Sequence, residues 1–120
     1  MNGNGIPQTI KSPLDGSEMR LTWNDEFDGD RINGKTWQLY DRMWAKNRVI
    51  TTTDPRNFAL ENGEAVMRTY REDGHYTSHK SLTTFDRMSF RYGYLEIYAI
   101  VPFSRGAFPA FWLQSAWQHR

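Results

Sequence analysis

The sequence has 120 residues, enough for one modest domain, and its 38% hydrophobic content permits a core of limited size. Fifteen lysines and arginines face 14 acidic residues, mixed along the chain, so the net charge of +1 gives no basic surface typical of nucleic-acid binding. A mean hydropathy of −0.76 excludes a membrane-spanning helix. We therefore expect neither nucleic acid nor a membrane as a partner.

Cysteine is absent, which excludes disulfides, thiolate metal sites and cysteine nucleophiles. Aromatic residues make up 15% of the chain, with five tryptophans, and this content fits either a dense core or a stacking surface. The first residues, Met1 to Gly5, have neither the basic nor the apolar region of a signal peptide. The sequence itself therefore shows no export signal.

The N-terminal third contains many turn-forming residues. Residues 1–19 are rich in Gly, Asn, Pro and Ser, which predicts a flexible lead before a domain that covers residues 20–120. The first expected strand is Arg20–Asn24. Turns are predicted at Asp28-Gly29-Asp30 and Asn33-Gly34-Lys35, and a weak helical pattern covers only Lys35–Tyr40.

The middle and the end of the chain predict strands. Two strand-like runs between Asn57 and Tyr70 flank Glu61-Asn62-Gly63, which is typical of a hairpin turn with a residue at positive φ. Further strands are expected at Tyr76–Thr84, Ser89–Val101 and, after a loop at Ser104-Arg105-Gly106, Ala107–Gln114. Short strands without intervening helices favour an all-β sandwich or jelly roll. Because such domains commonly have ~200–250 residues, we expect the chain to be an incomplete, N-terminal portion.

The run from Gly93 to Val101 alternates with a period of two residues. Its apolar face would form core, and consists of Leu95, Ile97, Ala99 and Val101. Its other face carries Tyr94, Glu96 and Tyr98, with Trp112 expected on a neighbouring strand. A carboxylate beside aromatic rings suits a ligand with apolar faces and hydroxyl edges, such as a sugar polymer. A binding surface and a polar patch over the core both fit this pattern.

Other candidate chemistry is better explained by structure. Glu26 and Asp28 could form a carboxylate pair, but the glycine-containing turn beside them favours acids that bind backbone amides or face water. Glu72 and Asp73 precede Gly74 in an expected solvated turn. His75 and His79 would lie about 13 Å apart on a strand, which is too far to share one metal ion. We therefore expect no metal site from these residues.

Five segments in this order resemble the N-terminal half of a glycoside hydrolase family 16 domain, the group of laminarinases, lichenases and agarases. They are Leu21-Thr22-Trp23-Asn24-Asp25-Glu26-Phe27-Asp28-Gly29, then Ile32-Asn33 with Trp37, then Asn57 to Arg68, then Tyr92-Gly93-Tyr94-Leu95-Glu96, and Phe108-Pro109-Ala110-Phe111-Trp112-Leu113. The resemblance implies a concanavalin-like β-jelly roll whose concave sheet binds glycan, and retaining endo-cleavage of β-glucan or a related polysaccharide.

Carried over by position, Glu96 and Trp112 would line the cleft, and Asn57 would contribute a polar contact at the start of a strand. Tyr98 stands where the family commonly has a basic residue, which would shift sugar recognition toward stacking. Some members hold a structural calcium ion, for which main-chain oxygens near Glu26 and Gly63 are the plausible contributors here. No other cofactor is implied.

Catalysis in this family uses a Glu-x-Asp-x-Glu or Glu-x-Asp-x-x-Glu run after the Pro-Ala-Phe-Trp segment. The sequence ends before such a run, and Glu26-Phe27-Asp28-Gly29-Asp30 has aspartate at the last place and lies far upstream. We therefore predict no catalytic residue within the chain, and we expect it to be inactive without the C-terminal half of the domain. The resemblance also implies secretion or a periplasmic location.

Two other hypotheses remain open. The chain could be a carbohydrate-binding, lectin-like module that uses Tyr94, Glu96, Tyr98 and Trp112 without chemistry. It could also be a truncated product without function, whose exposed sheet edges promote aggregation.

Overall fold

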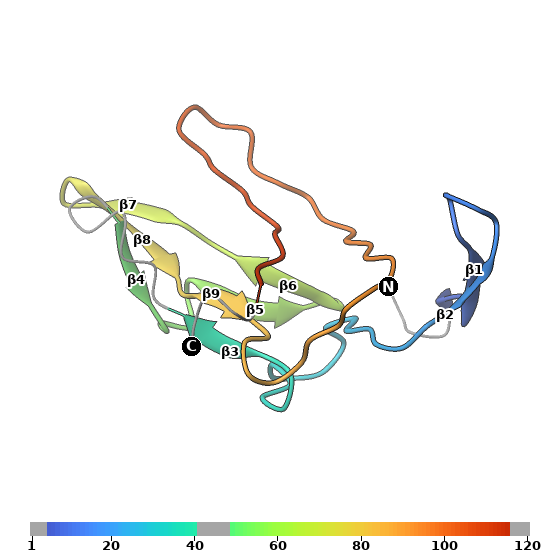
Figure 1. The fold of residues 1–120 in the computed structure, drawn as a ribbon. Coiled ribbons are helices and arrows are strands. Elements are labelled where there is room, and N and C mark those ends of the chain that lie inside the picture. The colour runs from blue at the N-terminus through green and yellow to red at the C-terminus, as the bar shows by residue number, and fades with distance from the viewer. Residues whose placement is uncertain (1–4, 41–48, 116–120) are drawn as a thin grey trace.

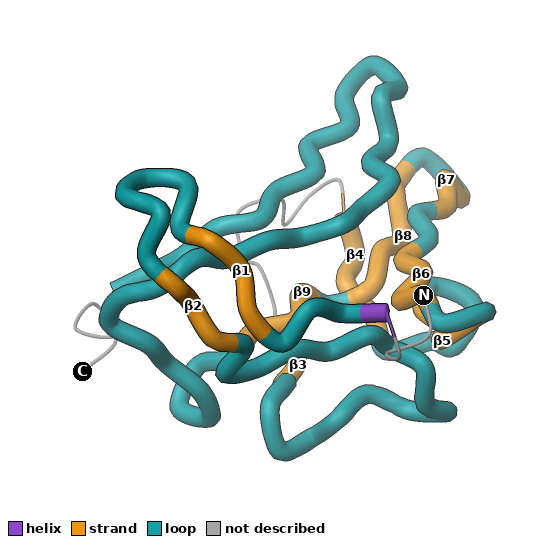
Figure 2. The backbone as a smooth tube through the Cα atoms, turned by 90° about the vertical axis from the view of Figure 1, so that its right-hand side faces the viewer, coloured by secondary structure: helices purple, strands orange, loops and turns teal. Residues whose placement is uncertain are grey.

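A computed structural model of the chain describes residues 5–40 and 49–115 (Figure 1). These residues form short strands and loops without an α-helix, and the helical piece near the N-terminus in Figure 2 is a single 3₁₀ residue, Gly5. The predicted all-β class is therefore confirmed for the described residues. The strands are β1 (Thr9–Lys11), β2 (Glu18–Arg20), β3 (Gln38–Tyr40), β4 (Val49–Thr52), β5 (Phe58–Glu61), β6 (Glu64–Met67), β7 (Tyr70–Glu72), β8 (His75–His79) and β9 (Ser81–Thr83).

The strands pair into four small sheets, in the orders β1-β2, β3-β9, β4-β8-β7 and β5-β6. Every pair is antiparallel except β4 with β8, which runs parallel with Val49 opposite Tyr76 and Thr52 opposite His79. β8 therefore lies at the centre of the largest sheet, with a parallel neighbour on one side and an antiparallel neighbour on the other.

The predicted hairpin between Asn57 and Tyr70 is confirmed. β5 and β6 pair in register from Phe58 opposite Met67 to Glu61 opposite Glu64. Asn62 and Gly63 both have positive φ, 54° and 74°, as the favoured two-residue hairpin turn requires. The two glutamates that face each other at the turn would repel, but Arg68 Nη2 lies 2.7 Å from Glu61 Oε2 and offsets that charge.

A second hairpin joins β7 to β8. Asp73 and Gly74 form its turn with φ of 47° and 82°, and Glu72 lies opposite His75. The turn predicted before Gly74 is thus confirmed for Asp73, whereas Glu72, expected in the same solvated turn, is the last residue of β7 and pairs with Arg56. β8 and β9 together cover most of the strand expected at Tyr76–Thr84. The turns predicted at Asn33-Gly34-Lys35 and Ser104-Arg105-Gly106 are also present.

The N-terminal segment differs from the prediction. β1 and β2 form an antiparallel hairpin within residues expected to be a lead, and residues 21–24, expected as strand, are loop. Alternating burial explains the hairpin, because Ile10 and Met19 lie opposite each other and are both half-buried between exposed neighbours. Figure 1 shows this hairpin standing apart from the other strands.

The weak helical pattern at Lys35–Tyr40 is also wrong. Residues 34–36 form a turn and Gln38–Tyr40 is β3, because this segment pairs with β9 through Leu39 opposite Leu82. The Gln38 side chain adds a bond by donating from Nε2 to the carbonyl of Phe85 at 2.5 Å. Tertiary pairing therefore decides the conformation against a weak local propensity.

The strands predicted at Ser89–Val101 and Ala107–Gln114 are absent. Residues 84–115 contain no strand and form a long arch, coloured orange to red in Figure 1. The expected core face is exposed as well, with Leu95 at 44% and Ile97 at 48%. A period of two shows which residues share a face, but a strand also needs a hydrogen-bonded neighbour, and no described strand pairs with this segment.

No hydrophobic side chain of the described residues is buried. The accessible surface is 10576 Å², whereas a compact monomer of 14.1 kDa exposes about 6,700 Å². The radius of gyration, 16.5 Å, likewise exceeds the value of about 14 Å for a compact domain of this length. The described strands are therefore held together by other means than a hydrophobic core.

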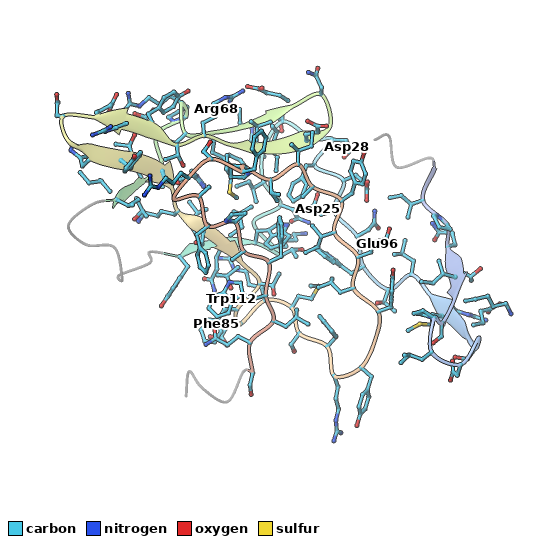
Figure 3. All side chains as sticks on the ribbon, turned by 90° about the horizontal axis from the view of Figure 1, so that it is seen from above. Asp25, Asp28, Arg68, Phe85, Glu96 and Trp112 are labelled. Carbon is cyan, nitrogen blue, oxygen red and sulfur yellow. The ribbon has the colours of Figure 1, made fainter. Side chains whose placement is uncertain are left out.

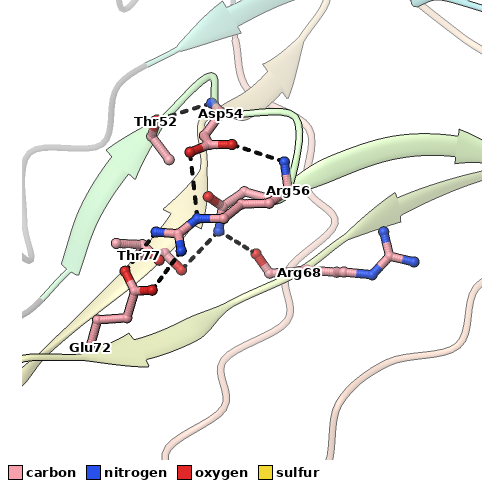
Figure 4. A network of polar contacts seen from close by, with 7 residues as sticks. Thr52, Asp54, Arg56, Arg68, Glu72 and Thr77 are labelled. Atoms are coloured by element: carbon pink, nitrogen blue, oxygen red, sulfur yellow. Dashed lines mark hydrogen bonds and ion pairs between the residues drawn. The ribbon is translucent and has the colours of Figure 1, made fainter.

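A buried asparagine, Asn57, connects the β5-β6 hairpin to the largest sheet. Figure 4 labels the two residues that it binds, Arg68 and Thr77. The Asn57 side chain is fully buried, and its Nδ2 donates to the carbonyls of Arg68 at 2.9 Å and Thr77 at 3.2 Å. The Arg68 amide in turn donates to the Asn57 carbonyl at 2.8 Å. One side chain thus ties the start of β5, the residue after β6 and the middle of β8.

Two further contacts reinforce this connection. The Phe58 ring stacks on the imidazole of His79 with centroids 4.5 Å apart. The Arg56 guanidinium binds both carboxylate oxygens of Glu72, at 2.5 and 2.6 Å, and lies 5.5 Å from the centre of the Tyr70 ring. The start of β5 and the loop before it are thereby fixed to β7 and β8 of the largest sheet.

Replacing Asn57 with alanine should loosen this junction. The change removes two buried hydrogen bonds and leaves two carbonyls without their donor, so we expect a loss of about 2 kcal/mol in local opening free energy. Hydrogen exchange of the Arg68 amide should accelerate about 30-fold. The matched variant Asn24→Ala, at an exposed asparagine without hydrogen bonds in the described structure, should leave that rate unchanged. Equal rates in both variants would contradict the role of Asn57.

His79 should make stability depend on pH. The residue is 9% exposed, and burial lowers the pKa of its imidazole below the ordinary value of 6.5. The unfolded chain therefore binds the proton first as pH falls, so the contribution of neutral His79 is complete above about pH 6.5 and decreases below it. Urea unfolding midpoints measured between about pH 8 and pH 5 should show this decline.

The variant His79→Phe keeps a ring against Phe58 but has no titrating group, and it should lose the decline in this pH range. His75→Gln, on the same strand, should retain it. An unchanged pH dependence in His79→Phe would show that another group is responsible.

Candidate functional site

Tyr94 and Glu96, which the sequence places on one face, contact each other in the structure. The Tyr94 hydroxyl donates to Glu96 Oε2 at 2.9 Å, and both side chains are exposed. This hydrogen bond, with a smaller contribution from the carboxylate charge, raises the pKa of the Tyr94 phenol. The phenol therefore stays protonated at neutral pH and holds the carboxylate in one orientation, while Oε1 makes no hydrogen bond within the described residues.

Tyr98 and Trp112 present their rings to solvent. Tyr98 is 86% exposed and Trp112 is 55% exposed. Figure 3 shows Trp112 on a different limb of the arch from Glu96, well separated in the view from above. The structure therefore brings Tyr94 and Glu96 together and leaves Trp112 apart from them.

Asn57 lies elsewhere, beneath the β5-β6 hairpin. Its side chain is fully buried and serves the strand junction described above. In this arrangement Asn57 stabilises the junction between the β5-β6 hairpin and β8, and its role as a sugar contact stays a prediction.

The arch also exposes aromatic residues that the sequence reasoning did not nominate. Tyr92 is 83% exposed, Phe103 fully exposed and Phe108 81% exposed. The guanidinium of Arg91 lies 5.4 Å from the centre of the Tyr92 ring. Tyr92 and Phe108 lie within the segments that carry the family resemblance, whereas the only sequence signal for Phe103 was the high aromatic content.

The acidic run near residue 25 forms a loop, as predicted. Asp25 Oδ1 accepts the Phe27 amide at 2.9 Å, and its Oδ2 accepts the indole Nε1 of Trp37 at 2.8 Å. Phe27, with φ of 53°, stacks on the same indole. The expectation that acids here bind backbone amides is therefore confirmed for Asp25, while Asp28 is exposed (Figure 3).

An open cavity of about 310 Å³ follows this loop and is lined by Asn24, Asp25, Glu26, Phe27, Asp28, Gly29, Arg31 and Asn33. Within the described ranges no three His, Cys, Asp or Glu side chains gather as a metal site would require. A calcium ion bound through main-chain oxygens near Glu26 and Gly63 stays a prediction.

No helix in the described part of the chain is long and apolar enough to cross a membrane.

Comparison with known proteins relates most of the chain to larger proteins. It is 23% identical over 116 residues to glucan endo-1,3-beta-glucosidase A1 of Niallia circulans, covering 79% of this chain and 17% of that protein. It is 29% identical over 104 residues to glucan endo-1,3-beta-glucosidase of Cryptopygus antarcticus, covering 78% of this chain and 37% of that protein.

A third relative is the clotting factor G alpha subunit of Tachypleus tridentatus, 29% identical over 99 residues, with 78% of this chain and 14% of that protein covered. The chain thus spans well under half the length of each of these relatives. No family model and no solved structure matches the chain. Two of these three distant relatives are named as glucan endo-1,3-beta-glucosidases.

Proposed function

We propose that the chain is the N-terminal portion of a glycoside hydrolase family 16 domain and that it forms part of the β-glucan-binding surface of that domain. The observation that carries the proposal is the similarity to two glucan endo-1,3-beta-glucosidases over 79% and 78% of the chain. In the complete domain the strands would belong to a concanavalin-like jelly roll.

The chemistry of the arch supports a sugar ligand. Pyranose rings offer apolar C–H faces that stack on aromatic rings and hydroxyl edges that bind carboxylates. The arch presents both partners in exposed positions, namely the rings of Tyr98 and Trp112 and the carboxylate of Glu96.

The large accessible surface supports a polypeptide partner as well. The excess over a compact monomer is roughly 3,900 Å² on this chain alone, which is more than the share of about 800 Å² that one partner contributes to an interface of standard size. Leu95, Ile97 and Val101 contribute to it with side chains that are 44–48% exposed. We propose that the C-terminal half of the domain covers this surface and pairs with the arch, which would then become strand.

Catalysis would come from that other half. Retaining glycosidases use two carboxyl groups about 5–5.5 Å apart, one as nucleophile and one as acid/base. This sequence contains no Glu-x-Asp-x-Glu run, and in the acidic loop Asp25 is already bound by Phe27 and Trp37. The chain would therefore bind and orient polysaccharide for chemistry performed by residues outside this sequence.

A second candidate function is carbohydrate binding without chemistry. The similarity to the clotting factor G alpha subunit favours it, because that relative is not named as a glucosidase. The same exposed residues would serve such a module. For either function we propose secretion or a periplasmic location, because a polymeric glucan does not enter cells.

Aromatic stacking should be measurable as affinity for glucan. Tyr98→Ala and Trp112→Ala should each weaken binding of a soluble β-1,3-glucan about 3- to 10-fold, since each removes one stacking ring. Isothermal titration or affinity electrophoresis would measure the change. Phe103→Ala, at a fully exposed aromatic residue outside the candidate set, is the matched control and should bind as the unaltered chain does. Equal losses in all three variants would argue against a defined surface.

The isolated chain should not hydrolyse the polysaccharide. We expect no reducing sugar above the buffer blank when the purified chain is incubated with β-1,3-glucan or mixed-linkage β-glucan, and Glu26→Gln should behave identically. Release of reducing sugar that Glu26→Gln abolishes would show that the acidic loop is catalytic.

A further inference from the structure

Glu96 and Tyr94 form the one charged contact within the run from Gly93 to Val101. In that run Glu96 is the sole ionisable acid or base apart from the tyrosines. Its carboxylate is held by the Tyr94 hydroxyl at 2.9 Å and is exposed. We infer that this pair makes the surface selective for neutral glycans over glycans that carry carboxylate or sulfate groups. The inference rests on the proposed glycan-binding function and specifies its substrate class.

Hydrogen bonding gives the first argument. An ionised carboxylate only accepts hydrogen bonds, so it needs donors from the ligand. The hydroxyl groups of a neutral sugar are such donors, whereas a uronate or a sulfate ester presents only acceptors at the substituted position. Tyr94 cannot compensate, because its single O–H is already donated to Glu96 Oε2.

The raised pKa of Tyr94 agrees with this arrangement. The hydrogen bond to Glu96 and the charge of that carboxylate both favour the protonated phenol. Glu96 thus presents a negative charge of fixed orientation. Tyr94 acts as a positioning residue that leaves Oε1 open to the ligand.

Local charges give the second argument. The nearest basic residue in the sequence, Arg91, has its guanidinium 5.4 Å from the centre of the Tyr92 ring. Tyr98 adds an exposed aromatic face, which carries negative electrostatic potential and favours C–H groups over anions. An anionic group about 4 Å from the exposed carboxylate would lose about 1 kcal/mol, or about 5-fold in affinity, even in water-like surroundings.

Matched ligands test this selectivity. We would measure the affinity of the full chain for a soluble β-1,3-glucan and for carboxymethylated and sulfated derivatives of the same length, at low ionic strength. The neutral glucan should bind at least about 5-fold more tightly than either derivative. Raising the ionic strength to about 0.15 M should reduce the difference, because salt screens exposed charges.

Three variants test whether the selectivity for neutral glucan arises from the charge of Glu96. Glu96→Gln keeps size and shape but removes the charge, and it should bring the ratio of neutral to anionic affinity close to one. Glu64→Gln removes an exposed glutamate on β6 and should keep the original ratio. Tyr94→Phe should weaken binding of the neutral glucan 2- to 5-fold while keeping the ratio, because the charge remains but is less well oriented.

The outcomes separate this inference from the proposed function. Binding of the neutral glucan with an unchanged ratio in Glu96→Gln would overturn the role of Glu96 and leave the glucan-binding function intact. Equal binding of neutral and anionic glucans by the unaltered chain would do the same. Failure of the chain to bind any of the glucans would overturn both.

Discussion

The described structure depends on a buried polar junction, since none of its hydrophobic side chains is buried. Asn57 supplies that junction by donating from one amide nitrogen to the carbonyls of Thr77, in β8, and Arg68, the residue after β6. Carbonyl groups shielded from water need donors, and the Asn57 amide supplies one to both. The hairpin β5-β6 therefore has a fixed position relative to β8, and the stacking of Phe58 on His79 follows from it.

The start of the arch at residues 84–115 is bound to the segment around β3, because Gln38 donates to the Phe85 carbonyl and Arg87 donates to the carbonyls of Gly34 and Trp37. No part of the arch, however, pairs with a described strand as a further strand of a sheet. The same lack of pairing exposes both faces of the Gly93–Val101 run, so the aromatic and acidic residues proposed to bind glycan are accessible, and the apolar residues opposite them are uncovered. Accessibility of the ligand face and exposure of the apolar face thus have one cause.

Local chemistry explains what the sequence could predict. Asn62-Gly63 selects a two-residue turn by its positive φ values, and Asp73-Gly74 carries the same signal for β7 and β8, which could have been recognised as a hairpin. The parallel pairing of β4 with β8 is non-local, and nothing in Val49–Thr52 specifies it. The strand expected at Ser89–Val101 is absent for a similar reason, because alternation shows which residues share a face but not which strand pairs with them.

Within the candidate site, the contact of Tyr94 with Glu96 agrees with their shared face, whereas the distance of Trp112 from Glu96 depends on the path of the arch.

Stability and recognition are therefore coupled through the arch. Fixing a flexible backbone costs about 1–2 kcal/mol per residue, and either a covering polypeptide or a bound glycan has to offset that cost. A polypeptide that pairs with the arch would offset it through backbone hydrogen bonds and burial of Leu95 and Ile97, leaving the opposite face preorganised for sugar. A glycan alone contacts only the face with Glu96 and Tyr98, so it would have to order the backbone with part of its own binding energy. Hence affinity for glycan should be weakest when the apolar face is uncovered, because the residues proposed to bind sugar would then be held only by an unpaired backbone.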